Sequence, residues 1–117
     1  DSALLASASA DGTVRLWDTW KYTQAGQFAA HAGGVLSVDF ADNNELVTTG
    51  IDGQTNRWDT AGKNLATYAP LSDWGYTARF GAKDAIVLAG AWNGTIELWE
   101  TASGTKVGEV LTSAAQS

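Results

Sequence analysis

Three similar octapeptides at a constant spacing are the feature that most constrains this chain of 117 residues. Residues 11–18 are DGTVRLWD, residues 52–59 are DGQTNRWD and residues 93–100 are NGTIELWE, so consecutive octapeptides begin 41 residues apart. A period of about 20 to 50 residues is typical of proteins that stack copies of one supersecondary unit. The sequence therefore predicts a repeated structural unit and not one irregular domain.

Each octapeptide has the pattern of a strand that follows a tight turn. Asp-Gly and Asn-Gly favour such turns because both residues tolerate positive φ. After the first turn, Val14 and Leu16 alternate with Thr13, Arg15 and Trp17, which gives the strand two different faces. A short run of small and β-forming residues precedes each turn, at residues 4–9, 46–49 and 86–89. We therefore expect each run and its octapeptide to form a β-hairpin.

Two further strands complete the predicted unit. Alternating apolar residues indicate a strand ahead of the second and third hairpins, with one face formed by Leu36, Val38 and Phe40, or by Tyr76, Ala78 and Phe80. A weaker strand follows each octapeptide, around residues 23–28, 64–68 and 105–110. No segment shows a convincing helical stripe, so the unit is predicted to be four short antiparallel strands.

Over its whole length the chain resembles the WD40-repeat family. The resemblance is carried by two Trp-Asp pairs, one Trp-Glu variant, a histidine ahead of a strand and two turn aspartates: Trp17-Asp18, Trp58-Asp59, Trp99-Glu100, His31, Asp11 and Asp52. It implies an all-β fold, a WD40-type β-propeller segment of four-stranded antiparallel blades with strands a to d. It also implies structural roles for the repeat residues.

The count of strands predicts that this segment is incomplete as a ring on its own. Residues 1–30 supply strands b, c and d of one blade, residues 31–70 and 71–111 supply two full blades, and residues 112–117 form a tail. Family propellers usually close with about seven blades. Either the chain is a fragment, or other chains close the ring; the uneven repeats favour a fragment. The absence of Met also indicates that Asp1 is not where translation began.

The resemblance implies a hydrogen-bonded tetrad of His, Ser or Thr, Asp and Trp inside a blade. His31, Asp52 and Trp58 match three of its positions in the second blade. The hydroxyl position stays open: counting back from each turn aligns Ser9, Gly50 and Ala91, with Thr48 and Thr49 displaced. In the third blade the network is predicted to be incomplete, with Leu71 or Ser72 in place of His and Asn93 at the turn.

Composition excludes several kinds of site. The chain has no Cys and one His, which excludes disulfides, cysteine nucleophiles and a multi-histidine metal site. Its net charge of −6 argues against binding nucleic acid or an anionic membrane, and no apolar run approaches the length of a membrane span. The start of the chain lacks the basic region and long apolar core of a signal peptide.

A catalytic triad could be drawn from His31, Asp52 and a hydroxyl such as Thr48. We favour the structural interpretation, because these residues satisfy one another inside a blade and no nucleophile elbow is present. The carboxylates are dispersed along the chain. We therefore predict no catalytic, cofactor-binding or metal-binding residues.

Arg57 and the extra tryptophans depart from the repeat. Arg57 stands where leucine stands in the other two octapeptides, so we expect it to pair with a carboxylate and Arg57→Leu to be tolerated. Trp74 and Trp92 belong to connections on one face and are candidate partner-binding residues. The alternative is structural: Trp92 packs over its own turn and Trp74 covers the position of the missing His. Trp20 and Tyr22 belong to the opposite face.

These features favour a non-catalytic scaffold for protein or peptide partners. An alternative comes from residues 89–113, AGAWNGTIELWETASGTKVGEVLTS, which are similar to the end of the propeller in large bacterial proteins that carry a c-type haem domain. The chain would then be an accessory domain of a larger bacterial enzyme or haem protein whose active part lies elsewhere. No Cys-x-x-Cys-His motif occurs here, so no haem is expected on this segment. The sequence does not predict a cellular compartment.

Overall fold

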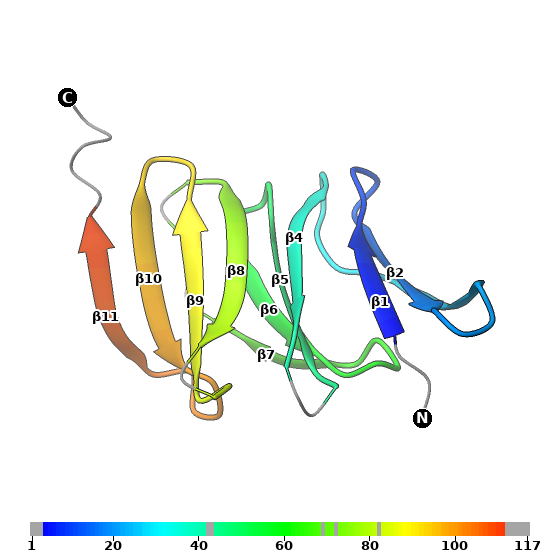
Figure 1. The fold of residues 1–117 in the computed structure, drawn as a ribbon. Helices are drawn as coiled ribbons and strands as arrows, with labels where there is room; N and C mark the ends of the chain where they lie inside the picture. Colours follow the sequence, from blue (N-terminus) through cyan, green and yellow to red (C-terminus); the bar gives the residue numbers. More distant parts are fainter. Residues whose placement is uncertain (1–3, 42–43, 69, 72, 82, 112–117) are drawn as a thin grey trace.

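The computed structural model describes residues 4–41, 44–68, 70–71, 73–81 and 83–111, and these form three antiparallel sheets without a helix (Figure 1). The first sheet contains β1 (Leu4–Ala8), β2 (Thr13–Asp18) and β3 (Thr23–Ala29). The second contains β4 (Val35–Phe40), β5 (Leu46–Gly50), β6 (Thr55–Trp58) and β7 (Asn64–Thr67). The third contains β8 (Gly75–Gly81), β9 (Ile86–Ala91), β10 (Thr95–Glu100) and β11 (Lys106–Leu111). The predicted tail, residues 112–117, and Ser72 lie outside the described residues.

The repeated Asp-Gly and Asn-Gly pairs form the turns that the sequence predicts. Gly12, Gly53 and Gly94 have φ angles of 91°, 77° and 93°, a region that glycine enters without a steric penalty. Each turn joins two strands paired in antiparallel register, β1 with β2, β5 with β6 and β9 with β10. The three predicted hairpins are therefore confirmed.

Bulges at matching places modify the predicted alternation of faces. Val35 lies opposite Gly50 and Ser37 opposite Thr49, so Leu36 is an extra residue in β4. The prediction that Leu36 shares a face with Val38 and Phe40 is wrong, because Leu36 is 41% exposed while Val35 is buried with the core. Tyr76 is the extra residue at the matching place in β8, but its side chain lies outside the described part of the chain.

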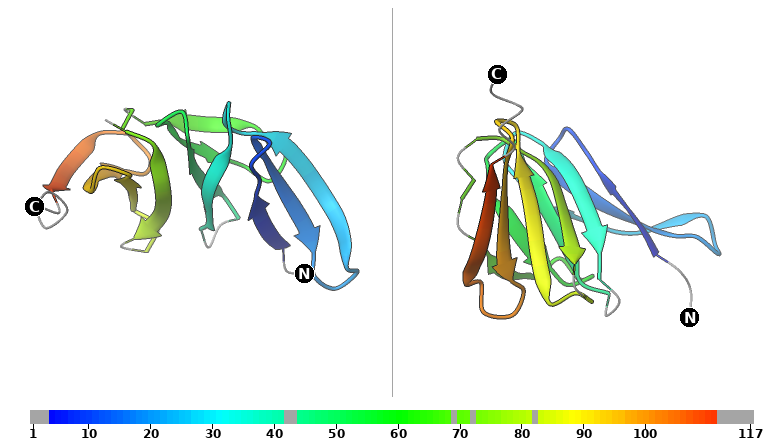
Figure 2. Two further views of the ribbon diagram at one scale, coloured as in Figure 1. Left: turned by 90° about the horizontal axis from the view of Figure 1, so that it is seen from above. Right: turned by 60° about the vertical axis from the view of Figure 1, so that its left-hand side comes forward.

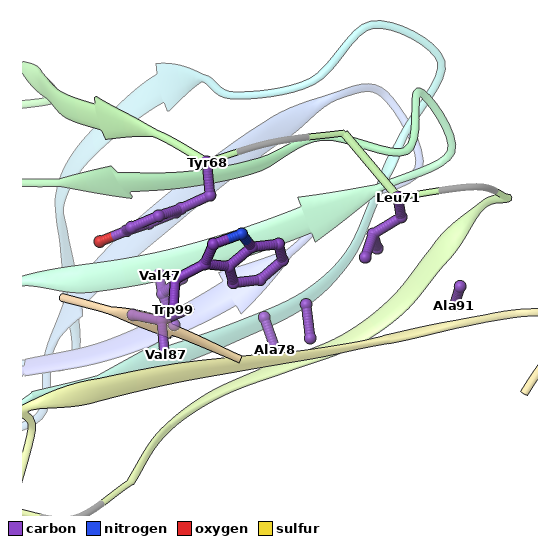
Figure 3. Close-up of a cluster of buried hydrophobic side chains, with 8 residues drawn as sticks. Val47, Tyr68, Leu71, Ala78, Val87, Ala91 and Trp99 are labelled. Atoms are coloured by element: carbon purple, nitrogen blue, oxygen red, sulfur yellow. The ribbon is translucent and has the colours of Figure 1, made fainter. Parts of the chain in front are cut away.

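The three sheets stand side by side along an arc (Figure 2), and an apolar core fills each space between them. The core between the first and second sheets contains Val14, Leu16, Val35, Leu46 and Trp58. The core between the second and third contains Val47, Tyr68, Leu71, Ala78, Val87, Ala89, Ala91 and Trp99, and in it the Tyr68 ring lies over the Trp99 indole (Figure 3). Successive residues of a strand point to opposite sides, so β5 places Leu46 in one core and Val47 in the other.

Polar contacts also fix the second sheet against the third. The Ser37 hydroxyl oxygen accepts a hydrogen bond from the Ala78 amide at 3.1 Å, and Asp39 Oδ2 accepts one from the Phe80 amide at 3.0 Å. Both bonds run from side chains of β4 to the backbone of β8. They set the offset between neighbouring sheets, which apolar packing alone fixes less sharply.

The outward face of the first sheet is uncovered within the described chain. Leu5 occupies the same repeat position as Leu46, but Leu5 is 58% exposed and Leu46 is fully buried. The sheets do not close into a ring. The described part of the chain contains no helix that is long and apolar enough to cross a membrane.

Candidate functional site

A buried hydrogen-bonded network joins three segments of the second sheet. His31, in the β3–β4 connection, is 5% exposed and lies with Nδ1 3.0 Å from Asp52 Oδ1 in the β5–β6 turn. Its Nε2 lies 2.7 Å from Thr48 Oγ1 in β5, and Trp58 Nε1 in β6 donates to the same oxygen at 2.9 Å. The structure thus brings together His31, Asp52 and Trp58, and Thr48 links them.

The partners determine where the protons lie. A carboxylate only accepts hydrogen bonds, so His31 Nδ1 donates to Asp52 and Nε2 accepts the Thr48 hydroxyl proton. Thr48 Oγ1 in turn accepts the Trp58 indole N–H. Burial lowers the pKa of His31, although the Asp52 carboxylate acts in the opposite direction. His31 is therefore neutral at pH 7, and the network is satisfied only in that state.

Counting back from the turn misplaced the hydroxyl position. Ser9, Gly50 and Ala91 are not the linking residues; the equivalent positions are Ser7, Thr48 and Ala89, each ten residues before a strand tryptophan. Gly50 has a different role, because a Cβ there would lie 2.9 Å from the His31 side chain. The constant distance to the tryptophan is the signal that could have identified Thr48 from the sequence.

The order Asp52, His31, Thr48 is that of a catalytic triad, but its geometry is that of a structural network. A nucleophile must reach its substrate, and Thr48 has no exposed surface. Its oxygen also accepts the Trp58 indole N–H. Among the described residues, no group of three or more His, Asp or Glu side chains could hold a metal ion.

The other two sheets contain progressively less of this network. In the first, Trp17 Nε1 donates to Ser7 Oγ at 3.0 Å. In the third, Ala89 replaces the hydroxyl residue and the fully buried Trp99 Nε1 has no hydrogen-bond partner in the described part of the chain. Asn93 Oδ1 accepts a hydrogen bond from the local Thr95 amide at 3.1 Å.

The acidic residues of the repeat stabilise turns by accepting hydrogen bonds. Asp11 Oδ1 accepts from the Thr13 amide and hydroxyl at 3.0 and 2.6 Å, and such hydrogen bonds lower the pKa of Asp11 to about 2. After the strand tryptophans, Asp18 Oδ1 accepts two amides of the following turn, and Asp59 Oδ1 does the same. Glu100 instead accepts the Ser103 hydroxyl at 2.6 Å. These carboxylates therefore have a structural explanation.

Arg57 pairs with a carboxylate, as expected. Its Nη1 lies 2.5 Å from Glu45 Oε1. Burial disfavours the charged guanidinium, but the hydrogen bonds and charge interactions with Glu45 and Tyr68 together outweigh burial and raise the pKa of Arg57. Neighbouring Tyr68 donates its hydroxyl proton to the Thr101 carbonyl at 2.8 Å. The sequence contained no local signal for Glu45 as the partner, because the two residues are brought together by the pairing of β5 with β6.

A cleft of about 520 Å³ opens beside Arg57 between the second and third sheets. It is lined by Ala41, Glu45, Arg57, Phe80, Asp84, Ala85, Ile86, Glu100, Thr101, Ala102 and Ser103. The Arg57 guanidinium is paired with Glu45, and the Ser103 hydroxyl donates a hydrogen bond to Glu100. The lining contains no histidine, so it offers no Ser–His pair for nucleophilic catalysis.

Trp74 and Trp92 form an exposed aromatic pair. Their ring centroids are 6.5 Å apart, with 47° between the ring planes, and the residues are 50% and 67% exposed. The Trp92 amide donates to the Trp74 carbonyl at 2.7 Å, which fixes the β9–β10 turn against the β7–β8 connection. Both connections lie at the top of Figure 1. Trp20, 69% exposed, belongs to the β2–β3 connection on the opposite face.

Comparison with known proteins agrees with this architecture. The sequence model of the family described as "WD domain, G-beta repeat" matches residues 1–18 and 22–59, which include the first two Trp-Asp pairs. The chain belongs to the WD40-repeat family. Its WD40 sheets are hereafter called blades.

Curated WD40 relatives match parts of the chain. WD repeat-containing protein 91 from Xenopus tropicalis is 38% identical over 73 residues, covering 60% of this chain and 10% of the relative. Guanine nucleotide-binding protein subunit beta from Saccharomyces cerevisiae is 28% identical over 111 residues, 88% of this chain and 26% of the relative. Periodic tryptophan protein 2 from Arabidopsis thaliana is 45% identical over 58 residues, 49% of this chain and 6% of the relative. The chain thus spans about a quarter or less of these relatives.

Proposed function

We propose that this chain is a non-catalytic WD40 propeller segment that holds a protein or peptide partner on the face at the top of Figure 1. We call this the upper face; it consists of the β1–β2, β3–β4, β5–β6, β7–β8 and β9–β10 connections. The observation that carries the proposal is the exposed pair Trp74 and Trp92. Large aromatic side chains on a rigid support are frequent energetic centres of protein interfaces.

The backbone beneath the pair supports this role because it is fixed by hydrogen bonds. The Leu71 amide donates to the Gly53 carbonyl at 2.8 Å, and the Trp74 amide donates to Asp73 Oδ1 at 2.8 Å. Binding would therefore order little additional backbone, which keeps its entropic cost low. The yeast relative is by name a subunit of a guanine nucleotide-binding protein, and this similarity also favours a role within a protein assembly.

The division into residues 1–30, 31–70, 71–111 and a tail at 112–117 belongs to the same proposal. Further blades, from the same polypeptide or from other chains, would cover the outward face that exposes Leu5. Mass measurement in solution tests this: a well-behaved monomer that remains soluble and folded at high concentration would contradict the need for such cover. No described residue bears on the alternative role as an accessory domain of a larger bacterial enzyme or haem protein.

A capture experiment tests the partner-holding role. The chain and its Trp74→Ala/Trp92→Ala variant are used as baits, retained proteins are identified, and each interaction is repeated with the purified protein. Trp20→Ala is the control, because Trp20 is an exposed tryptophan on the opposite face. We expect a purified partner to bind the chain and the control but not the double variant. Equal binding to all three would reject the aromatic pair as the partner site.

A further inference from the structure

The upper face differs from the lower face in charge as well as in aromatic content. The lower face consists of the β2–β3, β4–β5, β6–β7, β8–β9 and β10–β11 connections. The sequences of the upper connections contain Asp11, Asp52 and Asp73 and no lysine or arginine. Three of the four lysines belong to lower connections, and the fourth, Lys106, begins β11 directly after the last of them. The upper connections therefore carry carboxylates and no cation, whereas the lower connections carry three lysines alongside four carboxylates.

Within the described part of the chain, Asp52 and Asp73 make no salt bridge with a lysine or arginine, whereas Asp11 does. Arg15 lies 3.0 Å from Asp11 and balances it. Asp52 contacts His31, but a neutral imidazole does not cancel the negative charge of a carboxylate. The Asp52 side chain is 25% exposed. Asp73 directly precedes Trp74 and uses Oδ1 to accept the Trp74 amide, a bond that requires no proton on the carboxylate.

The connections that carry these groups contact one another. A Cβ on Gly53, the residue after Asp52, would lie 3.2 Å from the Asp73 carbonyl oxygen, so the β5–β6 turn contacts the β7–β8 connection. That connection in turn contacts the β9–β10 turn through the bond from Trp92 to Trp74. We call Asp52, Gly53, Asp73, Trp74 and Trp92 the Trp-Asp patch.

We infer that the Trp-Asp patch binds a basic peptide segment of a partner protein, with a lysine or arginine side chain against the indoles. A cation is attracted to the face of an indole ring and to nearby carboxylates, and the methylene stem of lysine or arginine packs on aromatic surface. An acidic segment would meet two uncompensated carboxylates and is disfavoured. This inference rests on the proposed function and specifies the chemistry of the partner.

Defined peptides test the inference directly. Fluorescein-labelled hexalysine, hexaserine and hexaglutamate are titrated with the chain at low salt, and binding is followed by fluorescence anisotropy. We expect binding of hexalysine only, weakened by added salt because the attraction is partly electrostatic. Replacing either tryptophan by alanine should weaken hexalysine binding roughly two- to five-fold, the range for one exposed cation–π contact.

Matched variants separate the patch from general attraction to an acidic chain. Asp73→Asn retains an oxygen for the Trp74 amide and removes one charge, and should weaken binding by up to about five-fold. Glu109→Gln removes one exposed charge from β11, where Glu109 is paired with Lys106 at 2.6 Å, and should leave binding unchanged, as should Trp20→Ala. Equal losses in Asp73→Asn and Glu109→Gln would overturn the inference, because the attraction would then be non-specific.

The outcomes distinguish this inference from the proposed function. Binding of hexaserine or hexaglutamate that depends on the tryptophans would overturn the basic chemistry and leave the aromatic pair as a partner site. Hexalysine binding unchanged in the Trp74→Ala/Trp92→Ala variant, or no binding of hexalysine, would overturn the inference. The capture experiment with the same double variant decides the proposed function independently.

Discussion

Replacing Thr48 by valine should destabilise the second blade by removing a single oxygen. Valine keeps the shape and volume of threonine, so the apolar contacts of β5 are retained. The Thr48 hydroxyl donates to His31 Nε2 at 2.7 Å and accepts from Trp58 Nε1 at 2.9 Å, and Thr48 is fully buried. Thr48→Val thus leaves two buried ring nitrogens without a partner.

The expected loss follows from these two atoms. A buried polar atom left unsatisfied costs about 1 to 3 kcal/mol, so the two together predict a loss of about 2 to 6 kcal/mol. That is a large part of the net stability of an ordinary domain, about 5 to 15 kcal/mol. His31 cannot compensate by moving its proton to Nε2, because Nδ1–H is required by Asp52.

Urea unfolding followed by far-ultraviolet circular dichroism measures the loss without relying on the fluorescence of Trp58, which the substitution alters directly. Thr55→Val is the matched control: Thr55 is also fully buried, but its hydroxyl oxygen has no partner within the described part of the chain. That substitution should be neutral or stabilising. Similar losses in the two variants, or no loss in Thr48→Val, would refute the account of the network.

Three further predictions concern the same packing. Ala89→Ser should give the buried Trp99 Nε1 an acceptor and raise the free energy of unfolding by about 1 kcal/mol in urea titrations, whereas a decrease would indicate overpacking. Arg57→Leu should lower the free energy of unfolding by less than about 1 kcal/mol, because the Glu45 side chain is 24% exposed and stays hydrated. Glu45→Leu should lower it more, because the less exposed Arg57 guanidinium then lacks its carboxylate partner. Equal losses in these two variants would contradict that explanation. Because the folded-state pKa of His31 lies below its ordinary value of 6.5, the unfolded chain binds more protons there, and stability should fall as the pH is lowered from about 6.5 through the folded pKa. His31→Gln should lack this part of the pH dependence in unfolding titrations, and an unchanged profile would show that His31 does not contribute.

Local patterns predicted the blades well because short-range rules determine them. The turn pairs at Asp11, Asp52 and Asn93 fix the hairpins. The alternation of apolar with polar residues correctly predicts that Val14 and Leu16 share a buried face. The exposure of Leu36 could not be predicted in this way, since a bulge adds one residue and breaks the two-residue period.

The candidate site was predictable where the repeat fixes it and not where two strands meet. His31, Asp52 and Trp58 could be named from the repeat, whereas Thr48 stayed one of several candidates for the hydroxyl position because alignment from the turn does not account for the pairing register of β5 with β6. Glu45 as the partner of Arg57 also depends on that register. The contact between Trp74 and Trp92 joins two connections that are distant in sequence, and only the packing of the third blade brings them together.

The indole N–H region of a two-dimensional nuclear magnetic resonance spectrum tests the central claim most directly. The chain has six tryptophans, and substitution assigns each signal. On addition of hexalysine, the account predicts that the signals of Trp74 and Trp92 shift together with one dissociation constant, while that of Trp20 stays in place. Shifts of Trp20 equal to those of the pair, or no shift of the pair, would contradict binding of a basic segment at the Trp-Asp patch.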